Sequence, residues 1–151
     1  VVAVKWNAPP DVPYEDMEQI ASELNILDNS GQPGRCYKHG GCGFMDHQAT
    51  AFPAHDLRVL ELLEAGKYDE GQALWDSVAV PLRQFYNKIS AKSGGSARKK
   101  KGVMAIMGHP VGAMRPPSLP LSEEEMTELR ELLVGLGWPV PEQAKAAAVA
   151  I

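Results

Sequence analysis

The chain has 151 residues, of which 44% are hydrophobic and 23% charged, a composition typical of an ordinary globular protein. Its formal net charge of -4 gives no electrostatic footprint for nucleic acid or for an anionic membrane surface, so we exclude both as partners. The sequence contains neither a run of about 18 apolar residues nor a secretory leader, and we therefore expect a cytoplasmic protein.

Three short strands are predicted in the first 45 residues. The run 1–4 is β-branched without polar alternation, which is typical of a parallel strand buried on both faces, and it ends at Lys5. Because the chain starts inside this run, we expect that earlier residues have been lost. The predicted elements are strands at 1–4, 25–28 and 41–45, a helix at 14–24 and a turn at 29–34. Their order is that of β–α units around a parallel sheet.

The second half of the chain is predicted to be helical. Apolar side chains recur at helical spacing in the segments 55–65, 68–89 and 122–136. Pro81 inside the second segment predicts a kink or a break, because proline removes a backbone donor. Ser122 and Glu125 have the spacing of a capping box and mark the start of the last helix.

Two segments between these helices are expected to be irregular. Segment 93–101 combines Ser and Gly with a basic cluster, and we predict a solvated loop there. The prolines at 116, 117 and 120 predict an extended strap before the last helix. Arg115 in this strap is expected to form a structural ion pair rather than to bind a carboxylate of a ligand.

The two cysteines, Cys36 and Cys42, are too few for a disulfide scaffold, and in a reducing compartment we expect both to stay thiols. With His39 and His47 they offer four possible zinc ligands. Their spacing matches no standard zinc motif, so we predict that no metal is bound. Cys42, which lies among glycines, is interpreted as a small buried hydrophobic residue.

Two segments of the second half carry a resemblance to a known family. Segment 62–74, followed by Val-Pro-Leu at 80–82, resembles the helix pair after the eighth strand in the family of dihydrodipicolinate synthase and N-acetylneuraminate lyase. Segment 108–122, with Arg-Pro-Pro at 115–117 and Pro-Leu-Ser at 120–122, resembles the strap that introduces the final helix of these barrels.

The first third of the chain resembles the last three strands of the same barrels. Segment 1–5 is similar to the sixth strand, 27–31 to the seventh strand with its Ser-Gly turn, and 40–45 to the eighth strand. The resemblance implies an α/β fold, a partial (β/α)8 (TIM) barrel made of the last three βα units and followed by a carboxy-terminal helical region. The implied organisation is barrel strands in 1–54, the helical region in 55–140 and a tail in 141–151.

The resemblance also implies a Schiff-base-forming lyase, of aldolase or synthase type, that acts on pyruvate or a related 2-keto acid. Lys5 is the implied imine-forming residue, and Ser30, Gly31 and Met45 are the implied substrate-binding residues. A lysine attacks a ketone only as the free amine, so its pKa must fall from about 10.4, and burial at a barrel strand end provides that shift. No metal or organic cofactor is required. The full-length protein is expected to be a homo-oligomer.

Several features distinguish this chain from the family pattern. A whole barrel needs about 250 residues, and the family's carboxylate-binding turn and catalytic tyrosine lie on earlier strands, so we expect an inactive fragment. Gln32-Pro33 replaces the usual acidic residues, and Asp46-His47 is unusual after the eighth strand, so the identity of the substrate does not follow from the sequence. Condensation, cleavage and dehydration share the same imine, so the sequence does not separate these reactions either. Asp28, Ser30 and His47 fit either pocket-lining groups or caps of turns.

Two hypotheses therefore stand. In the first, the chain is part of a class I aldolase-type enzyme in which Lys5 forms the imine. In the second, it is a non-catalytic truncated remnant whose helices serve only association. Without the resemblance, Lys5 would be interpreted as a solvated lysine at the end of a strand.

Overall fold

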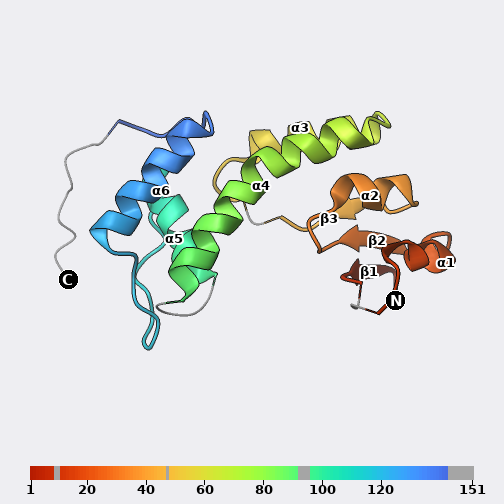
Figure 1. The fold of residues 1–151 in the computed structure, drawn as a ribbon, viewed down its shortest axis with the longest axis horizontal. Coiled ribbons are helices and arrows are strands. Elements are labelled where there is room, and N and C mark those ends of the chain that lie inside the picture. Colours follow the sequence, from red (N-terminus) through yellow and green to blue (C-terminus); the bar gives the residue numbers. More distant parts are fainter. Residues whose placement is uncertain (9–10, 47, 92–95, 143–151) are drawn as a thin grey trace. The chain divides into compact units, whose positions relative to one another are not determined.

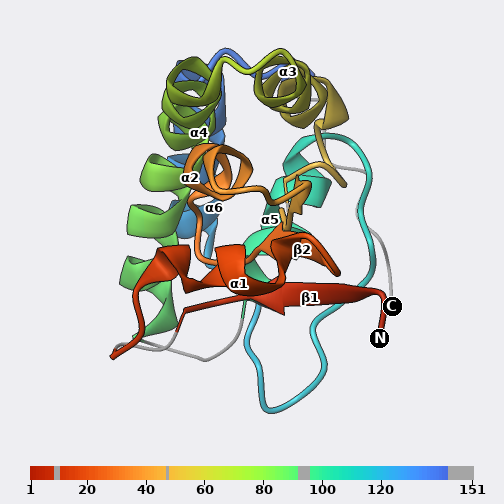
Figure 2. The same cartoon turned by 90° about the vertical axis from the view of Figure 1, so that its right-hand side faces the viewer.

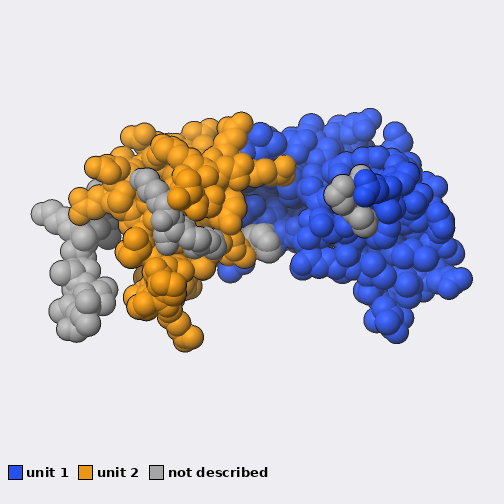
Figure 3. Space-filling model, turned by 60° about the horizontal axis from the view of Figure 1, so that its bottom comes forward, with its two compact units in different colours: residues 1–80 blue, residues 81–151 orange. Residues whose placement is uncertain are grey.

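The computed structural model describes residues 1–8, 11–46, 48–91 and 96–142. The chain forms two compact units, unit 1 with residues Val1–Val80 and unit 2 with residues Pro81–Ile151 (Figure 3). Most of the expected tail, from residue 143 onward, lies outside the described residues. The sequence analysis placed the boundary between the barrel strands and the helical region at residue 54. This division of the chain stays a prediction.

Unit 1 contains a three-stranded parallel sheet in the order β1-β2-β3 (Figure 1). The strands are β1 (Ala3–Trp6), β2 (Asn25–Asp28) and β3 (Gly43–Phe44). The three strands predicted from the sequence are therefore confirmed, and β2 has the predicted bounds. This sheet and the helices around it agree with part of a (β/α)8 barrel.

One face of the sheet is covered by short helical elements. The chain between β1 and β2 forms a 3-10 helix, η1 (Tyr14–Met17), and a single turn, α1 (Glu18–Ala21). Tyr14, Met17, Ile26 and Cys36 form the buried cluster on this face, and Val4 and Trp6 pack against it. Successive strand residues point to opposite faces, which puts Lys5 on the other face of the sheet, where it is exposed.

A helix that the sequence analysis missed follows the turn after β2. We predicted a turn over 29–34, but Pro33 is the first residue of α2 (Pro33–Lys38), which lies beside β2 and β3 (Figure 2). Proline suits this position, because the first helical N–H has no partner within the helix. Gly34 fits tightly against the next helix but one: a Cβ atom here would lie 2.5 Å from the carbonyl oxygen of Tyr68.

Two long helices complete unit 1. They are α3 (Pro53–Glu64) and α4 (Tyr68–Ser90), as the helical spacing predicted, and α4 continues into unit 2. Val59 and Leu63 of α3 and Trp75 and Ala79 of α4 form a second buried cluster. The helix α4 continues through Pro81, so of the predicted kink or break the break is wrong, and the kink stays a prediction.

Unit 2 corrects the interpretation of the basic segment. Its helices are α5 (Ala97–Ile106) and α6 (Glu123–Gly135). We predicted a solvated loop over 93–101, yet residues from Ala97 onward are helical and both Arg98 and Lys99 are buried. Residues 92–95 lie outside the described residues. Two of the four residues of the basic cluster, Arg98 and Lys99, therefore belong to the interior.

Arg98 holds the strap in place. Its guanidinium donates hydrogen bonds to the carbonyl oxygens of Ile89 (2.8 Å), Leu119 (2.8 Å) and Pro120 (2.9 Å), and to Glu125 Oε2 (2.9 Å). Glu125 also completes the predicted capping box with Ser122, which is confirmed. The side chains of Arg98 and Glu125 are 3% and 6% exposed, so this ion pair is almost fully shielded from solvent.

Arg115 does not have the predicted role. It is exposed, and within the described part of the chain it forms no ion pair. The strap is held instead by Arg98 and by Lys101, whose ammonium donates to the carbonyl oxygens of Val111, Gly112 and Ala113 at 3.3, 3.2 and 2.7 Å.

None of the helices described here combines the length and the apolar character that crossing a membrane requires.

We predict that Arg98→Met destabilises the chain by roughly 3–5 kcal/mol, because the buried charge of Glu125 would lose the guanidinium that lies 2.9 Å from it. Lys88→Met is the matched control: it removes the exposed ion pair between Lys88 and Glu128 and should cost less than about 1 kcal/mol. Urea unfolding followed by circular dichroism measures both. Equal losses for the two variants would contradict the central role of Arg98.

Candidate functional site

The carboxyl ends of the three strands meet at one edge of the sheet. The register pairs Trp6 with Asp28 and Asp28 with Phe44, so the three strands end level with one another. Two backbone hydrogen bonds extend this alignment by one residue, from Asn29 N to the Trp6 carbonyl (2.8 Å) and from Met45 N to the Asp28 carbonyl (2.7 Å). Side chains at this edge are therefore candidates for a shared site.

Lys5 lies one residue before that edge, on the open face of the sheet. Lys5 is paired with Leu27 of β2, and Leu27 is paired in turn with Gly43 of β3. A Cβ atom on Gly43 would lie 2.5 Å from Leu27 Cδ2, so the missing side chain of Gly43 leaves room for Leu27. The open face thus has one amine, one aliphatic side chain and bare backbone in a single row.

Asp28 organises the turn that follows β2. Its side chain is buried, with the residue only 1% exposed. Oδ1 accepts hydrogen bonds from Tyr14 Oη (2.9 Å), Ser30 N (3.0 Å) and Ser30 Oγ (2.7 Å). Oδ2 accepts from the backbone N–H groups of Gly31 (3.0 Å) and Gln32 (2.9 Å). Of the two roles considered for Asp28, the structure gives it that of a turn cap.

This arrangement limits what the turn offers a ligand. The hydroxyl of Ser30 and the N–H groups of Ser30 and Gly31 already donate to Asp28. Ser30 Oγ accepts a hydrogen bond from Gln32 Nε2 at 3.4 Å, and a hydroxyl oxygen can accept one more. The turn can therefore offer a ligand hydrogen-bond acceptors but not these donors. The substrate-binding roles of Ser30 and Gly31 stay predictions.

Tyr14 is a positioning residue that the sequence analysis did not identify. Burial, together with the nearby charge of Asp28, raises the pKa of Tyr14 above its usual value. The phenol therefore stays protonated and donates its hydrogen bond to Asp28. The aromatic ring also stacks edge-on against Trp6 at 6.5 Å between centroids. A tyrosine at the start of a predicted helix gives no signal of such a role.

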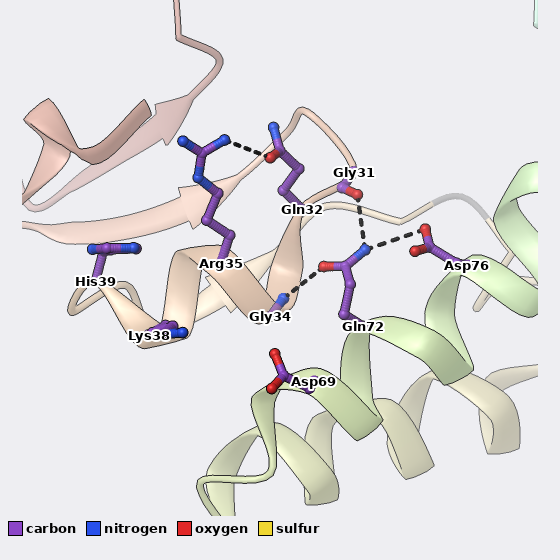
Figure 4. A pocket seen from close by; sticks show the side chains of 9 residues that line it. All are labelled: Gly31, Gln32, Gly34, Arg35, Lys38, His39, Asp69, Gln72 and Asp76. Carbon is purple, nitrogen blue, oxygen red and sulfur yellow. Dashed lines mark hydrogen bonds between the residues drawn. The ribbon is translucent and has the colours of Figure 1, made fainter. Parts of the chain in front are cut away.

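Gln72 of α4 ties the turn and α2 together from the other side. Its side-chain oxygen accepts from Gly34 N (3.0 Å), and its amide nitrogen donates to the Gly31 carbonyl and to Asp76 Oδ1, both at 3.2 Å (Figure 4). These groups line a cavity of about 560 Å³ together with side chains of α2. Lys5 is not among the lining residues, so this cavity is separate from the edge that carries the amine.

Met45 lies at the same edge of the sheet, whereas the cysteines and histidines considered as metal ligands do not form a cluster among the described residues. Met45 follows β3 and is 40% exposed. Cys36 is buried, which raises the pKa of its thiol, whereas Cys42 is exposed, so the predicted burial of Cys42 is wrong. The imidazole of His39 lies 2.5 Å from Glu18 Oε1. His47 lies outside the described residues, and among the residues described there is no group of three or more His, Cys, Asp or Glu side chains that could hold a metal ion.

Comparisons with known proteins find likeness in structure. No family model and no curated protein matches the sequence. Dihydrodipicolinate synthase from Aquifex aeolicus superimposes with a TM-score of 0.66 at 17% identity, over 94% of this chain and 47% of that one. The enzyme of that name from Oceanobacillus iheyensis has a TM-score of 0.59 at 26% identity, over 83% of this chain and 40% of that one.

A Sulfolobus 2-keto-3-deoxygluconate aldolase, solved as a complex with D-KDPG, has a TM-score of 0.63 at 18% identity, over 81% of this chain and 40% of that one. The chain thus spans less than half the length of the solved structures it matches. The resemblance seen in the sequence is confirmed: the chain has the fold of a partial domain of the dihydrodipicolinate synthase and aldolase type.

Proposed function

We propose that the chain carries the imine-forming part of a Schiff-base lyase that acts on pyruvate or a related 2-keto acid, with Lys5 as the nucleophile. The observation that supports this most directly is the position of Lys5, one residue before the carboxyl end of β1 and on the face of the sheet away from the helices. Active sites of (β/α)8 barrels lie at that end of the strands. One of the structures that the chain resembles is a 2-keto-3-deoxygluconate aldolase.

The chemistry follows from an amine in that position. The free amine adds to the ketone carbon, and loss of water gives a protonated imine that withdraws electrons from the neighbouring carbon. Condensation, cleavage and dehydration can all proceed from this intermediate, and none of them needs a metal or an organic cofactor. The acceptor groups of Ser30 and Gly31 would bind hydroxyl groups of a hydroxylated 2-keto acid, because pyruvate itself has no donor, and Met45 would supply an apolar contact next to the edge.

The proposal includes a dependence on further strands. Lys5 is exposed, whereas an imine-forming lysine works in a desolvated setting. Three strands are described, and a closed barrel has eight. We therefore propose that this chain is active only as part of a longer, cytoplasmic and oligomeric protein, in which other strands cover Lys5 and bind the carboxylate of the keto acid.

The second candidate is a non-catalytic association module. It is favoured by the sheet, because among the described residues β1 and β3 are each paired on one side only and the face that carries Lys5 is open. Unpaired strand edges are templates for contact with another chain. This candidate needs no nucleophile, so labelling of Lys5 distinguishes the two.

In a chimera that joins this chain to the first five βα units of a dihydrodipicolinate synthase, borohydride in the presence of pyruvate should attach a reduced pyruvyl group to Lys5. Peptide mass spectrometry locates the label. Lys5→Arg should abolish labelling, and Lys38→Arg, which changes another exposed lysine, should not. Labelling at a different lysine, or turnover without any label, would remove Lys5 from the mechanism.

The chain by itself is expected to have no measurable lyase activity and to associate in solution. Static light scattering over a range of concentrations measures the association, and an assay with pyruvate and a set of aldehydes measures activity. A monomer that turns over a keto-acid substrate would show that further strands are dispensable.

Asp28→Asn should loosen the turn, because an amide group replaces an acceptor with a donor where Gly31 N and Gln32 N point. We expect a loss on the order of 3 kcal/mol in unfolding free energy and faster amide exchange at Gly31 and Gln32. Ser30→Ala removes one hydroxyl and should cost about 1 kcal/mol. In the chimera, Asp28→Asn should also lower the yield of labelled Lys5. Unchanged amide exchange would show that Asp28 does not hold the turn.

A further inference from the structure

The thiols of Cys36 and Cys42 lie near one carbonyl group on the covered face of the sheet. Cys36 Sγ is 3.9 Å and Cys42 Sγ is 3.8 Å from the carbonyl oxygen of Ile26. The N–H of Cys42 donates to the same oxygen at 2.9 Å, which sets Cys42 beside Ile26, one residue before β3. Leu27 and Gly43 share the open face. Alternation along the chain therefore puts Cys42 on the covered face, where Ile26 and Cys36 belong to one buried cluster.

Gly41 leaves the space between the two cysteines free of a side chain. Its N–H donates to the Cys36 carbonyl oxygen at 2.8 Å, so the backbone has already turned back to Cys36 one residue before Cys42. A Cβ atom on Gly41 would lie 2.2 Å from Cys36 Sγ, so this sulfur occupies the place of the missing side chain. A disulfide needs Cβ atoms about 4 Å apart. Because the loop is already closed, bond formation requires mainly that Cys42 Sγ turns away from Asn25 Oδ1, which is 3.6 Å from it.

The two thiols differ in their access to solvent. Cys42 is exposed and lines a cavity of about 460 Å³ beside α3, whereas Cys36 is 0% exposed. A small oxidant therefore reaches Cys42 and does not reach Cys36. Burial also raises the pKa of the Cys36 thiol, and since the thiolate is the reactive form, Cys36 does not react with an oxidant by itself. Oxidation of the pair has to begin at Cys42.

We propose that Cys36 and Cys42 are a reversible redox pair, in which a peroxide oxidises Cys42 and Cys36 then closes a disulfide between α2 and the start of β3. In the first step Cys42 Sγ takes one oxygen atom from hydrogen peroxide, becomes a sulfenic acid and releases water. In the second step Cys36 Sγ attacks Cys42 Sγ. The S–S bond forms, the S–O bond breaks, and the departing hydroxide takes the proton of Cys36 and leaves as water.

The two steps together oxidise both thiols at the expense of one peroxide. The thiols lose two electrons and two protons, and the peroxide becomes two water molecules. A dithiol such as dithiothreitol reverses the reaction by thiol–disulfide exchange. The nearness of Cys36 to Cys42 offsets the low reactivity of the buried thiol, because attack within one chain replaces an encounter between two molecules.

The disulfide changes the support of the turn that Asp28 organises. Cys36 and Tyr14 belong to the same buried cluster, and Tyr14 Oη donates to Asp28 Oδ1. When Cys36 Sγ moves toward Cys42, Tyr14 loses packing on that side and the turn after Asp28 opens more often. Oxidation thereby acts on the sheet edge next to Lys5. Only this link to catalysis rests on the proposed function, because neither the disulfide nor its effect on the turn involves Lys5.

A disulfide between two copies of the chain is the competing outcome, because Cys42 is exposed. Within one chain, however, the second sulfur already shares the Ile26 carbonyl group with Cys42. Its effective concentration is therefore far above that of a second chain at micromolar concentration. The contacts favour the bond within the chain.

The test treats the reduced chain with hydrogen peroxide and digests it with trypsin under non-reducing conditions. Trypsin cleaves after Arg35, Lys38 and Arg58, which separates the two cysteines into the peptides 36–38 and 39–58. A disulfide leaves these peptides joined, and mass spectrometry detects the joined pair. A non-reducing denaturing gel detects disulfides between chains, and dimedone traps a sulfenic acid.

Cys42→Ser and Cys36→Ala are the test variants, and Met45→Leu, which removes another exposed sulfur atom, is the matched control. The unchanged chain and Met45→Leu should give joined peptides in a monomeric chain, and dithiothreitol should separate them. Cys36→Ala should give dimedone-labelled Cys42 without joined peptides. Cys42→Ser should lose its remaining thiol at least about tenfold more slowly. If circular dichroism shows that Cys36→Ala does not fold, Cys42→Ser decides alone, since position 42 is exposed.

Oxidation should also speed amide exchange at Gly31 and Gln32 by at least about threefold in the unchanged chain, and not in Cys42→Ser. Three outcomes would overturn the redox pair: no joined peptides after peroxide, dimedone on Cys36 in place of Cys42, or disulfides between chains only. Unchanged amide exchange in the disulfide form would overturn the effect on the turn. None of these measurements depends on Lys5, so failure here is distinguishable from failure of the lyase proposal.

Discussion

The carboxyl group of Asp28 is the interaction on which the candidate site depends. It ends the central strand of the sheet, and it is buried where an unsatisfied charge would be very costly. Five donors from four residues satisfy it, and they come from η1 and from the turn before α2. The carboxylate of Asp28 thereby connects the segment before β2 to the segment after it. These contacts fix the positions of the residues at the sheet edge next to Lys5.

Hydrophobic patterning explains why much of the fold was predictable. The run that ends at Lys5 and the segment 25–28 are short, apolar and bounded by turn residues, and both are strands. The capping box of Ser122 and Glu125 was predictable for a different reason, since both partners lie within one helical turn. These elements have causes that are local in the sequence, and they were predicted correctly.

Two of the errors concern residues whose surroundings come from distant parts of the chain. Pro33 and Gly34 indicate a turn when considered alone, yet Pro33 begins α2, and Gly34 N at the start of that helix donates to Gln72 of α4. Arg98 belongs to a basic cluster that suggested a solvated loop, but carbonyl groups of the strap and Glu125 make burial of its charge possible. In the site, the position of Lys5 followed from the strand pattern, whereas the role of Tyr14 depends on a contact across 14 residues.

Gly34 has a consequence for how the chain tolerates change. The smallest possible addition, the methyl group of alanine, would meet both the backbone of Tyr68 and the side chain of Gln72. The helix α2 would have to move away, and the hydrogen bond from Gly34 N to Gln72 would break with it. Replacing Gly34 with alanine would thus add a steric clash and at the same time remove the hydrogen bond to Gln72. In a map of tolerated substitutions, position 34 would have the profile usually given to a catalytic residue, although its contribution is the absence of atoms.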